Sequence, residues 1–200
     1  MQTNSIDLIS LKNTFDELSS QLLAAVPDDP AQRDPGNSPG LLAEAMEKVF
    51  QLLEAIRQEP GTESGSDEAK HDIHQLGDYA FNLLADLASI AGAHGLNDLS
   101  HEIEDLSLPF AVWIARQGGV LSTLEPIVNA ISNQANSVRE PIALKQLYEL
   151  TGEIQDAVTP TLQQDLEKTN PGRPWRILLL NRAIIATRSH NLELLETAYD

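Results

Sequence analysis

Apolar residues recur at steps of three and four along most of this chain, and proline or glycine interrupts the pattern at short intervals. This recurrence places apolar side chains on one face of an α-helix, whereas a half-buried strand needs strict alternation. Leu42, Met46, Val49, Leu53 and Ile56 illustrate it. Aromatic residues make up only 4% of the chain, so aliphatic side chains supply the core, as is typical of helical proteins. The sequence therefore predicts an all-α fold.

The N-terminal part of the chain reads as one helix on a linker. Residues 5–26 carry the helical pattern, whereas residues 27–40 contain four prolines and two glycines, which favour an extended, solvated segment. We therefore divide the chain into residues 1–40, an N-terminal amphipathic helix with a proline-rich linker, and residues 41–200, a helical domain. Glycine and serine predict a second flexible joint at 60–67.

Helix start and stop signals divide the rest of the chain into short helices. The segments expected to be helical are 38–58, 66–94, 97–108, 110–117, 121–136, 141–158, 161–168, 174–188 and 191–200. Short loops between such helices force antiparallel neighbours. We therefore expect an array of antiparallel helical hairpins, either tetratricopeptide-like or an irregular helical bundle. The tetratricopeptide consensus itself is not met, so the prediction concerns architecture and not that family.

Two segments of 17 residues hint at internal repetition. Residues 83–99 and 178–194 carry the same amino acid at six aligned positions. Small residues within them, such as Ala91 and Ala186, allow two helices of a hairpin to approach closely.

The C-terminal end of the chain is short for a terminal helix. The sequence stops at Asp200, about nine residues into the last expected helix. A helical array usually ends in a longer element with a polar outer face. We therefore expect either an abrupt natural end or a chain truncated at its C-terminus.

Charge restricts the classes of partner. The chain carries 30 acidic and 13 basic residues, a formal net charge of -17. Such a chain repels phosphate backbones and anionic headgroups, so we expect neither a nucleic acid nor a membrane as partner. The N-terminus lacks the basic start of a signal peptide, and the chain contains no cysteine, which excludes thiol catalysis. We expect a cytoplasmic protein that binds another protein or a peptide.

The negative charge is spread unevenly. Residues 1–167 hold 27 acids and 8 bases, whereas residues 168–200 hold 3 and 5, and no acid lies between Glu167 and Glu193. One interpretation is a concave surface that grips a carboxylate or an acidic peptide. The candidate binding residues are Trp175, Arg176, Asn181, Arg182 and Arg188. The other interpretation is that these arginines pair with the acidic helices of residues 71–167 inside the fold.

A histidine cluster opens the long helix predicted from residue 66. His71, His74 and Asp78 fall on one helix face, where two imidazoles and a carboxylate are suitable metal ligands. Their spacing is not that of the metalloprotease helix, and no second ligand pair is evident in the sequence. A metal site is therefore the weaker interpretation, and a solvent-exposed helix face is the expected one.

Residues 74–77, with the sequence HQLG, resemble the motif of histidine-phosphotransfer domains, in which a helical histidine is followed closely by a leucine and a glycine. That family typically has a lysine before the glycine and a small residue after it, whereas here the lysine is missing and Asp78 follows. The resemblance covers four residues. It implies a four-helix bundle in which His74 accepts a phosphoryl group.

Two further groups are candidates for a binding surface. Asn129, Asn133 and Asn136 form an amide stripe on one helix face, which either binds a peptide backbone or is exposed to solvent. Trp113, Phe110 and Arg116 are close enough along a helix to form a stacked cluster, and we expect its aromatic pair in the core and not on a ligand shelf.

The sequence offers no motif for catalysis. It contains no supported Ser-His-Asp arrangement, Gly-rich phosphate loop or carboxylate pair, so we expect neither enzymatic activity nor a cofactor. The prediction is a non-catalytic protein-interaction or adaptor module that grips an acidic peptide or carboxylate with its C-terminal arginine-rich face. A helical signalling domain that uses His74 is the alternative. The oligomeric state and the identity of the partner stay open.

Overall fold

The computed structural model describes residues 6–26, 38–58, 67–164 and 173–199, and these ranges are built from α-helices without a β-strand. The helices are α1 (Leu8–Ala25), α2 (Pro39–Gln58), α3 (Asp67–Ala93), α4 (Asn97–Asp105), α5 (Ser107–Arg116), α6 (Glu125–Ser137), α7 (Pro141–Ala157), α8 (Pro160–Gln163), α9 (Pro174–Ser189) and α10 (Leu192–Tyr199). The all-α prediction is confirmed.

Local sequence signals place most helix ends where they were expected. The Ser38 hydroxyl accepts a backbone hydrogen bond at 3.2 Å at the start of α2. Pro141 and Pro174 are the first residues of α7 and α9, where a missing N–H costs nothing. Asn191 caps α10, because its side-chain oxygen accepts the Glu193 N–H at 3.0 Å.

The segment 97–117 differs from its prediction at two points. Leu96 is the N-cap of α4, and Asn97, which we expected to cap it, is the first helical residue. The break between α4 and α5 falls at Leu106, three residues before Pro109, which lies in the first turn of α5. Proline is tolerated there because the first N–H groups of a helix have no helical partner.

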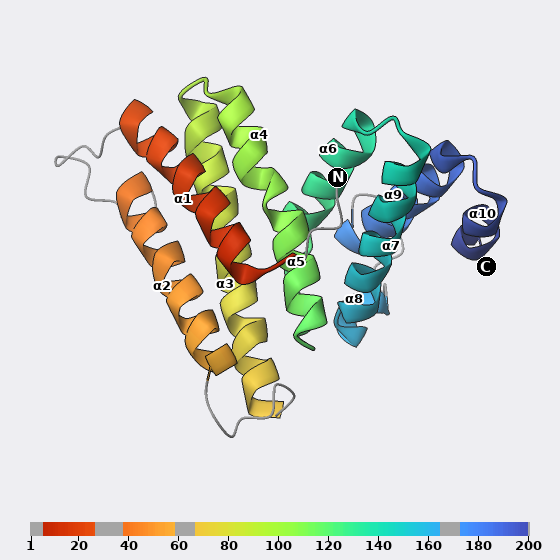
Figure 1. The fold of residues 1–200 in the computed structure, drawn as a ribbon, viewed down its shortest axis with the longest axis horizontal. Helices are drawn as coiled ribbons and strands as arrows, with labels where there is room; N and C mark the ends of the chain where they lie inside the picture. The colour runs from red at the N-terminus through yellow and green to blue at the C-terminus, as the bar shows by residue number, and fades with distance from the viewer. Residues whose placement is uncertain (1–5, 27–37, 59–66, 165–172, 200) are drawn as a thin grey trace.

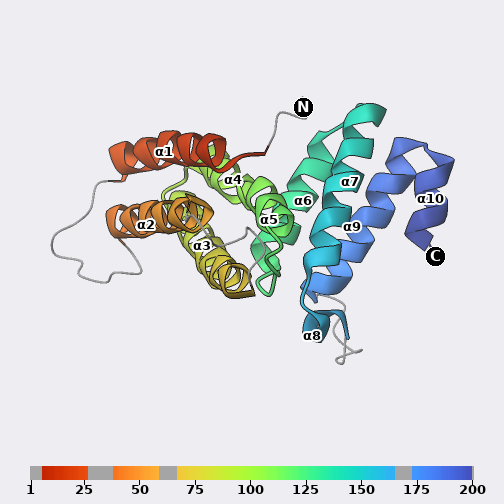
Figure 2. The same cartoon turned by 60° about the horizontal axis from the view of Figure 1, so that its bottom comes forward.

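Two groups of helices lie on either side of α5. Figure 1 shows α1 to α4 together at one end and α6, α7, α9 and α10 at the other. In Figure 2 the second group forms a row, and α9 lies between α7 and α10. Contacts agree with this view, because α9 packs against α6, α7 and α10. Helix α9 therefore has neighbours on several of its sides.

A single hydrophobic cluster runs through both groups. It includes Leu22 of α1, Leu53 of α2, Phe110 of α5 and Ile185 of α9, all of them almost completely buried. The N-terminal helix is therefore part of the common core. Most of the predicted linker, and nearly all of the predicted joint at 60–67, lie outside the described residues.

The two similar 17-residue segments adopt the same local structure. Residues 83–99 span the end of α3, a turn and the start of α4, and residues 178–194 span α9, a turn and the start of α10. Gly95 and His190 occupy the same aligned position, and both have a left-handed backbone, with φ of 76° and 53°. Each segment is therefore a helical hairpin with its turn at the same place.

The prediction of an all-α fold therefore describes these ranges. Within the described ranges, none of the helices combines the length and apolar composition needed to cross a lipid bilayer.

Candidate functional site

Asn181 faces the interior of the molecule. It is 8% exposed, and its side-chain amide donates to the Ser132 hydroxyl at 2.8 Å and to the Val128 carbonyl at 3.4 Å. Both acceptors belong to α6, so Asn181 ties α9 to α6. A buried amide with two partners contributes to packing.

Arg182 lies in the contact between α9 and α7. Its guanidinium stacks on the Tyr148 ring, 4.5 Å from the ring centroid, and donates to the Gln155 side-chain oxygen. Gly152 lies directly beside the guanidinium, because a Cβ at that position would lie 3.4 Å from Arg182 Nη2, in van der Waals contact. This interaction resembles a cation–π contact that also fixes the distance between the two helices.

Arg188 connects α9 to the end of α6. Its guanidinium donates to the Val138 carbonyl at 2.8 Å, which satisfies a carbonyl at the C-terminal end of α6. Within the described part of the chain, neither Arg182 nor Arg188 forms an ion pair with a carboxylate. Both arginines are therefore engaged within the fold, by stacking and by polar acceptors instead of acids.

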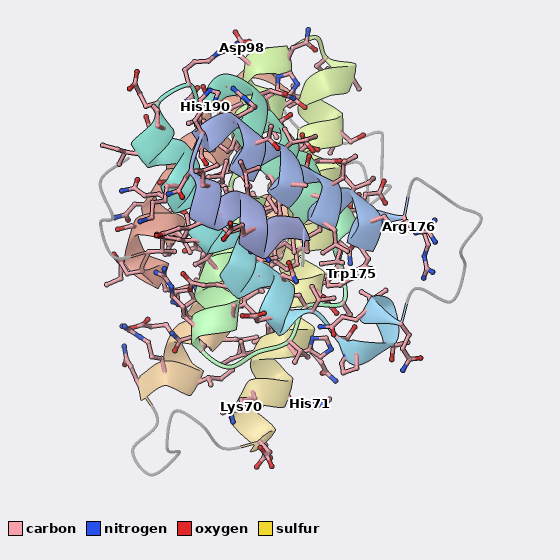
Figure 3. The ribbon with its side chains drawn as sticks, turned by 90° about the vertical axis from the view of Figure 1, so that its right-hand side faces the viewer. Lys70, His71, Asp98, Trp175, Arg176 and His190 are labelled. Atoms are coloured by element: carbon pink, nitrogen blue, oxygen red, sulfur yellow. The ribbon has the colours of Figure 1, made fainter. Side chains whose placement is uncertain are left out.

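Trp175 and Arg176 lie apart from these three residues. Figure 3 shows them at the N-terminal end of α9, with Arg176 extending outward and His190 at the opposite end of the helix. Trp175 is half-buried and packs against the hydrophobic core, and Arg176 also interacts within the chain. The structure thus places the five predicted binding residues on one helix but on different sides of it.

The other side of α9 is apolar and exposed. Leu180 is 60% exposed, and Leu179 and Ile184 are 39% exposed each. On α10, Leu192 is 75% exposed. Helical geometry puts Leu180 and Ile184, one turn apart, opposite the buried Leu178. We call the four exposed side chains the α9–α10 outer face.

The sequence contains a signal for this surface. Residues 174–188 have no polar face, because their apolar side chains are mixed with arginines around the helix axis. Such a helix has apolar side chains on more sides than one layer of neighbours covers. Here α6, α7 and α10 cover only part of it.

His71, His74 and Asp78 share one side of α3, as predicted, but have separate partners. The His71 Nε2 atom accepts from the Gln75 amide at 2.9 Å, and His71 is exposed. His74 donates from Nδ1 to the Val120 carbonyl at 2.8 Å, and the same Nδ1 lies 3.8 Å from the Asp78 carboxylate.

Asp78 holds the loop between α5 and α6. Its carboxylate accepts the Thr123 N–H at 2.9 Å, the Ser122 N–H at 3.3 Å and the Ser122 hydroxyl. Together with His74, it fastens this loop to α3. Among the described residues, no group of three or more histidines and acids is arranged to hold a metal ion.

The amide stripe on α6 contacts two acids of α4. Asn129 and Asn133 donate to the two Glu104 carboxylate oxygens at 3.1 Å each. Asn136, the third member of the stripe, is exposed. Two of the three amides are therefore used in packing α6 against α4.

Asp105 is the second acid in this contact. Asn133 donates to it at 3.2 Å and Gln134 at 2.9 Å. Burial raises the pKa of the Asp105 carboxyl above its ordinary value, and these two hydrogen bonds oppose part of the rise.

The aromatic residues of α5 belong to the core, which confirms the prediction. Phe110 and Trp113 are buried and stacked, with ring centroids 6.2 Å apart. Phe81 meets the edge of Phe110 at 5.6 Å. These rings join α3 and α5 and leave no aromatic shelf for a ligand at this point.

Comparison of the chain with protein-family models, curated proteins and solved structures found no match. The functional interpretation therefore depends on the geometry of the chain itself.

Proposed function

We propose that this protein is a non-catalytic interaction or adaptor module that docks a partner protein on the α9–α10 outer face. The observation that carries the proposal is the exposure of Leu179, Leu180, Ile184 and Leu192 on two adjacent helices. Leu180 and Ile184 lie one turn apart on α9, and exposed apolar side chains that adjoin one another are typical of interaction sites. Of the arginines that the sequence predicted to bind a partner, Arg176 is included in this proposal, because it lies at the N-terminal end of α9.

The internal repeat supplies a control for this interpretation. In the aligned hairpin α3–α4, the positions of Leu180 and Ile184 are taken by Ala85 and Ser89. Ser89 is exposed and Ala85 is half-buried. A hairpin of this kind therefore folds with small or polar residues at these positions, and this supports a role for the larger apolar residues of α9 outside the hairpin itself.

This role suits the finer architecture expected from the sequence, a tetratricopeptide-like array of helical hairpins acting in the cytoplasm. Stacked hairpins of that kind present extended surfaces to partner proteins.

Site-specific photocrosslinking tests the docking proposal. A photoreactive amino acid at position 180 is expected to give a discrete adduct in the native cells, because this position lies within the proposed interface. The same amino acid at position 85, its aligned counterpart on α3, is the matched control and is expected to give none. Equal adducts at both positions, or an absence of adducts at 180, would contradict the proposal.

One observation favours the alternative function, phosphotransfer through His74. The Val120 carbonyl accepts from Nδ1 of His74, which fixes the ring tautomer and leaves the Nε2 lone pair as the nucleophile. The nearby Asp78 carboxylate opposes it, because it repels an incoming phosphoryl group. Incubation with a phosphoryl donor should then give an acid-labile label that His74→Gln abolishes and His71→Gln leaves intact. A label that persists in His74→Gln would contradict this alternative.

A further inference from the structure

We propose that the contact between α4 and α6 is a pH-sensitive joint, which tightens when an acid within it takes up a proton. Figure 1 shows the place of this joint, because α4 belongs to one group of helices and α6 to the other. The joint is made of Glu104 and Asp105 on α4 and of Asn129, Asn133 and Gln134 on α6. The inference goes beyond the docking of a partner on α9 and does not depend on it.

Amides alone hold the two acids of the joint. Asn133 donates from its amide nitrogen to both carboxylates, at 3.1 Å to Glu104 and at 3.2 Å to Asp105. Asn129 adds a second donor to Glu104, and Gln134 adds one to Asp105 at 2.9 Å. Both acids are half-buried, and within the described ranges no ion pair includes either of them. When both are ionised, the contact therefore contains two adjacent negative charges without a cation bound to them.

The charges that act on Asp105 come from its own helix. Burial is the largest cause of its raised pKa, the charge of Glu104 adds to the rise, and the hydrogen bonds from α6 and the charge of His101 oppose it. The ionisable residues on the other helices in contact with α4 are not among these causes. They are Lys12, Asp16 and Glu17 on α1, Asp67, Glu68, Lys70, His71, Asp72, His74, Asp78, Tyr79 and Asp86 on α3, Arg116 on α5 and Glu125 on α6.

The environment of Asp105 makes closure of the joint depend on pH. Opening the contact between α4 and α6 exposes Asp105 to water and returns its pKa toward the ordinary value of 3.8. The closed joint therefore binds the proton more tightly than the open joint does. By linkage, closure is most favourable below pH 3.8, and this contribution is lost as pH rises through the raised value.

The hydrogen bonds of the joint survive the uptake of the proton. A protonated carboxyl group keeps acceptor capacity, so Asp105 still accepts from Asn133 and Gln134. Glu104 then holds its own two amide donors without a second negative charge beside it. Protonation thus removes the repulsion and leaves the contacts that join α4 to α6.

Amide hydrogen exchange of the full-length protein, followed by NMR, tests the joint. The intrinsic exchange rate at each pH is divided by the measured rate, so that the resulting protection factor reports opening. We expect the protection factors of the α6 amides around Asn133 to rise as pH is lowered from about 7 to about 4, and to rise more than those around Leu53, in the buried part of α2. The side-chain amide signals of Asn133 and Gln134 give the midpoint of the same transition.

Three variants separate the contributions to this transition. Asp105→Asn keeps the size of the side chain and removes its proton uptake, so the extra rise in α6 protection is expected to be lost. Glu104→Gln keeps an acceptor for Asn129 and Asn133 but removes the neighbouring negative charge, so the midpoint is expected to shift to lower pH. Glu102→Gln, at an exposed acid of α4, is the matched control and is expected to leave the midpoint unchanged.

Three results would overturn the joint. An extra rise in α6 protection that persists in Asp105→Asn would show that another group takes up the proton. Equal changes around Asn133 and Leu53 in the wild type would show that the pH dependence belongs to the fold as a whole. A midpoint that Glu104→Gln leaves unchanged, or shifts to higher pH, would contradict the coupling of the two acids, and this result decides alone if Asp105→Asn does not fold.

Discussion

The carboxylate of Asp78 connects α3 to the loop that leads into α6, through two backbone N–H groups and one hydroxyl. Replacement of Asp78 by alanine leaves these donors without their acceptor. We expect Asp78→Ala to lower the free energy of unfolding by about 1–3 kcal/mol. Urea denaturation measures this, and Asp86→Ala, at an exposed acid of the same helix, is the control. Equal losses in the two variants would show that the loop is held by other contacts.

Asp105 gives the stability of the protein a defined pH dependence. Because its pKa is raised in the folded state, the folded protein binds this proton more tightly than the unfolded chain does. The stability from Asp105 therefore falls as pH rises from the ordinary value of 3.8 through the raised folded value, and it stays low above that value.

Asp105→Asn removes this titration. We expect the free energy of unfolding of the wild type, minus that of the variant, to be larger at pH 4 than at pH 7. Denaturation curves at the two pH values measure the difference. A difference that is constant, or that is larger at pH 7, would contradict the shift.

For the arginines of α9, the sequence predicted their presence in one segment but not the direction of their side chains. The absence of acids between Glu167 and Glu193 was visible in the sequence, and this segment contains residues that join helices. The direction of each side chain was not visible, since polar and apolar residues are mixed around the axis of α9 and no amphipathic pattern tells which face is inside. In the structure, Asn181 faces α6 and Arg182 faces α7, whereas Leu180 and Ile184 are exposed.

The hairpins α3–α4 and α9–α10 both turn at a residue with positive φ, but only one of the two residues is a glycine. Gly95 adopts its positive φ without strain, whereas His190 adopts the same conformation with a side chain. We expect Gly95→Ala to destabilise the protein by about 1 kcal/mol, although an added Cβ would touch nothing within 4 Å. His190→Gly should stabilise it by about 0.5 kcal/mol. Thermal unfolding measures both changes in stability. If Gly95→Ala stabilised the protein, or His190→Gly destabilised it, the positive φ would not be the property that decides stability at these two turns.

Most helices could be predicted because their ends are encoded locally. Ser38, Pro141, Pro174 and Asn191 act within one turn of their own positions, so no tertiary contact is needed to find them. The break at Leu106 is different. Pro109 marks the region but lies three residues after the break, in the first turn of α5, and Leu106 and Ser107 are both buried where α4 meets α5.

At the scale of the whole molecule, one hydrophobic cluster joins α1 to α9, and polar contacts fasten the helices at its edges. Arg116 of α5 and Glu153 of α7 illustrate this, with a two-point ion pair at 2.7 and 2.9 Å. The order of the helices in space could not be predicted, because short loops determine which neighbours are antiparallel but not how successive pairs are rotated. The α9–α10 outer face is a product of that arrangement, since among the described residues α6, α7 and α10 pack against α9 and leave Leu180 and Ile184 exposed.

The most direct test of this account is the affinity of the partner that crosslinks at position 180. Calorimetry compares the wild type, the Leu180→Ala/Ile184→Ser variant and the control Leu52→Ala. We predict that the double variant loses about 2 kcal/mol of binding free energy, or about 30-fold in affinity, because about half of the newly buried apolar area disappears. The control should bind as the wild type does. An unchanged affinity in the double variant would contradict the docking of a partner on α9.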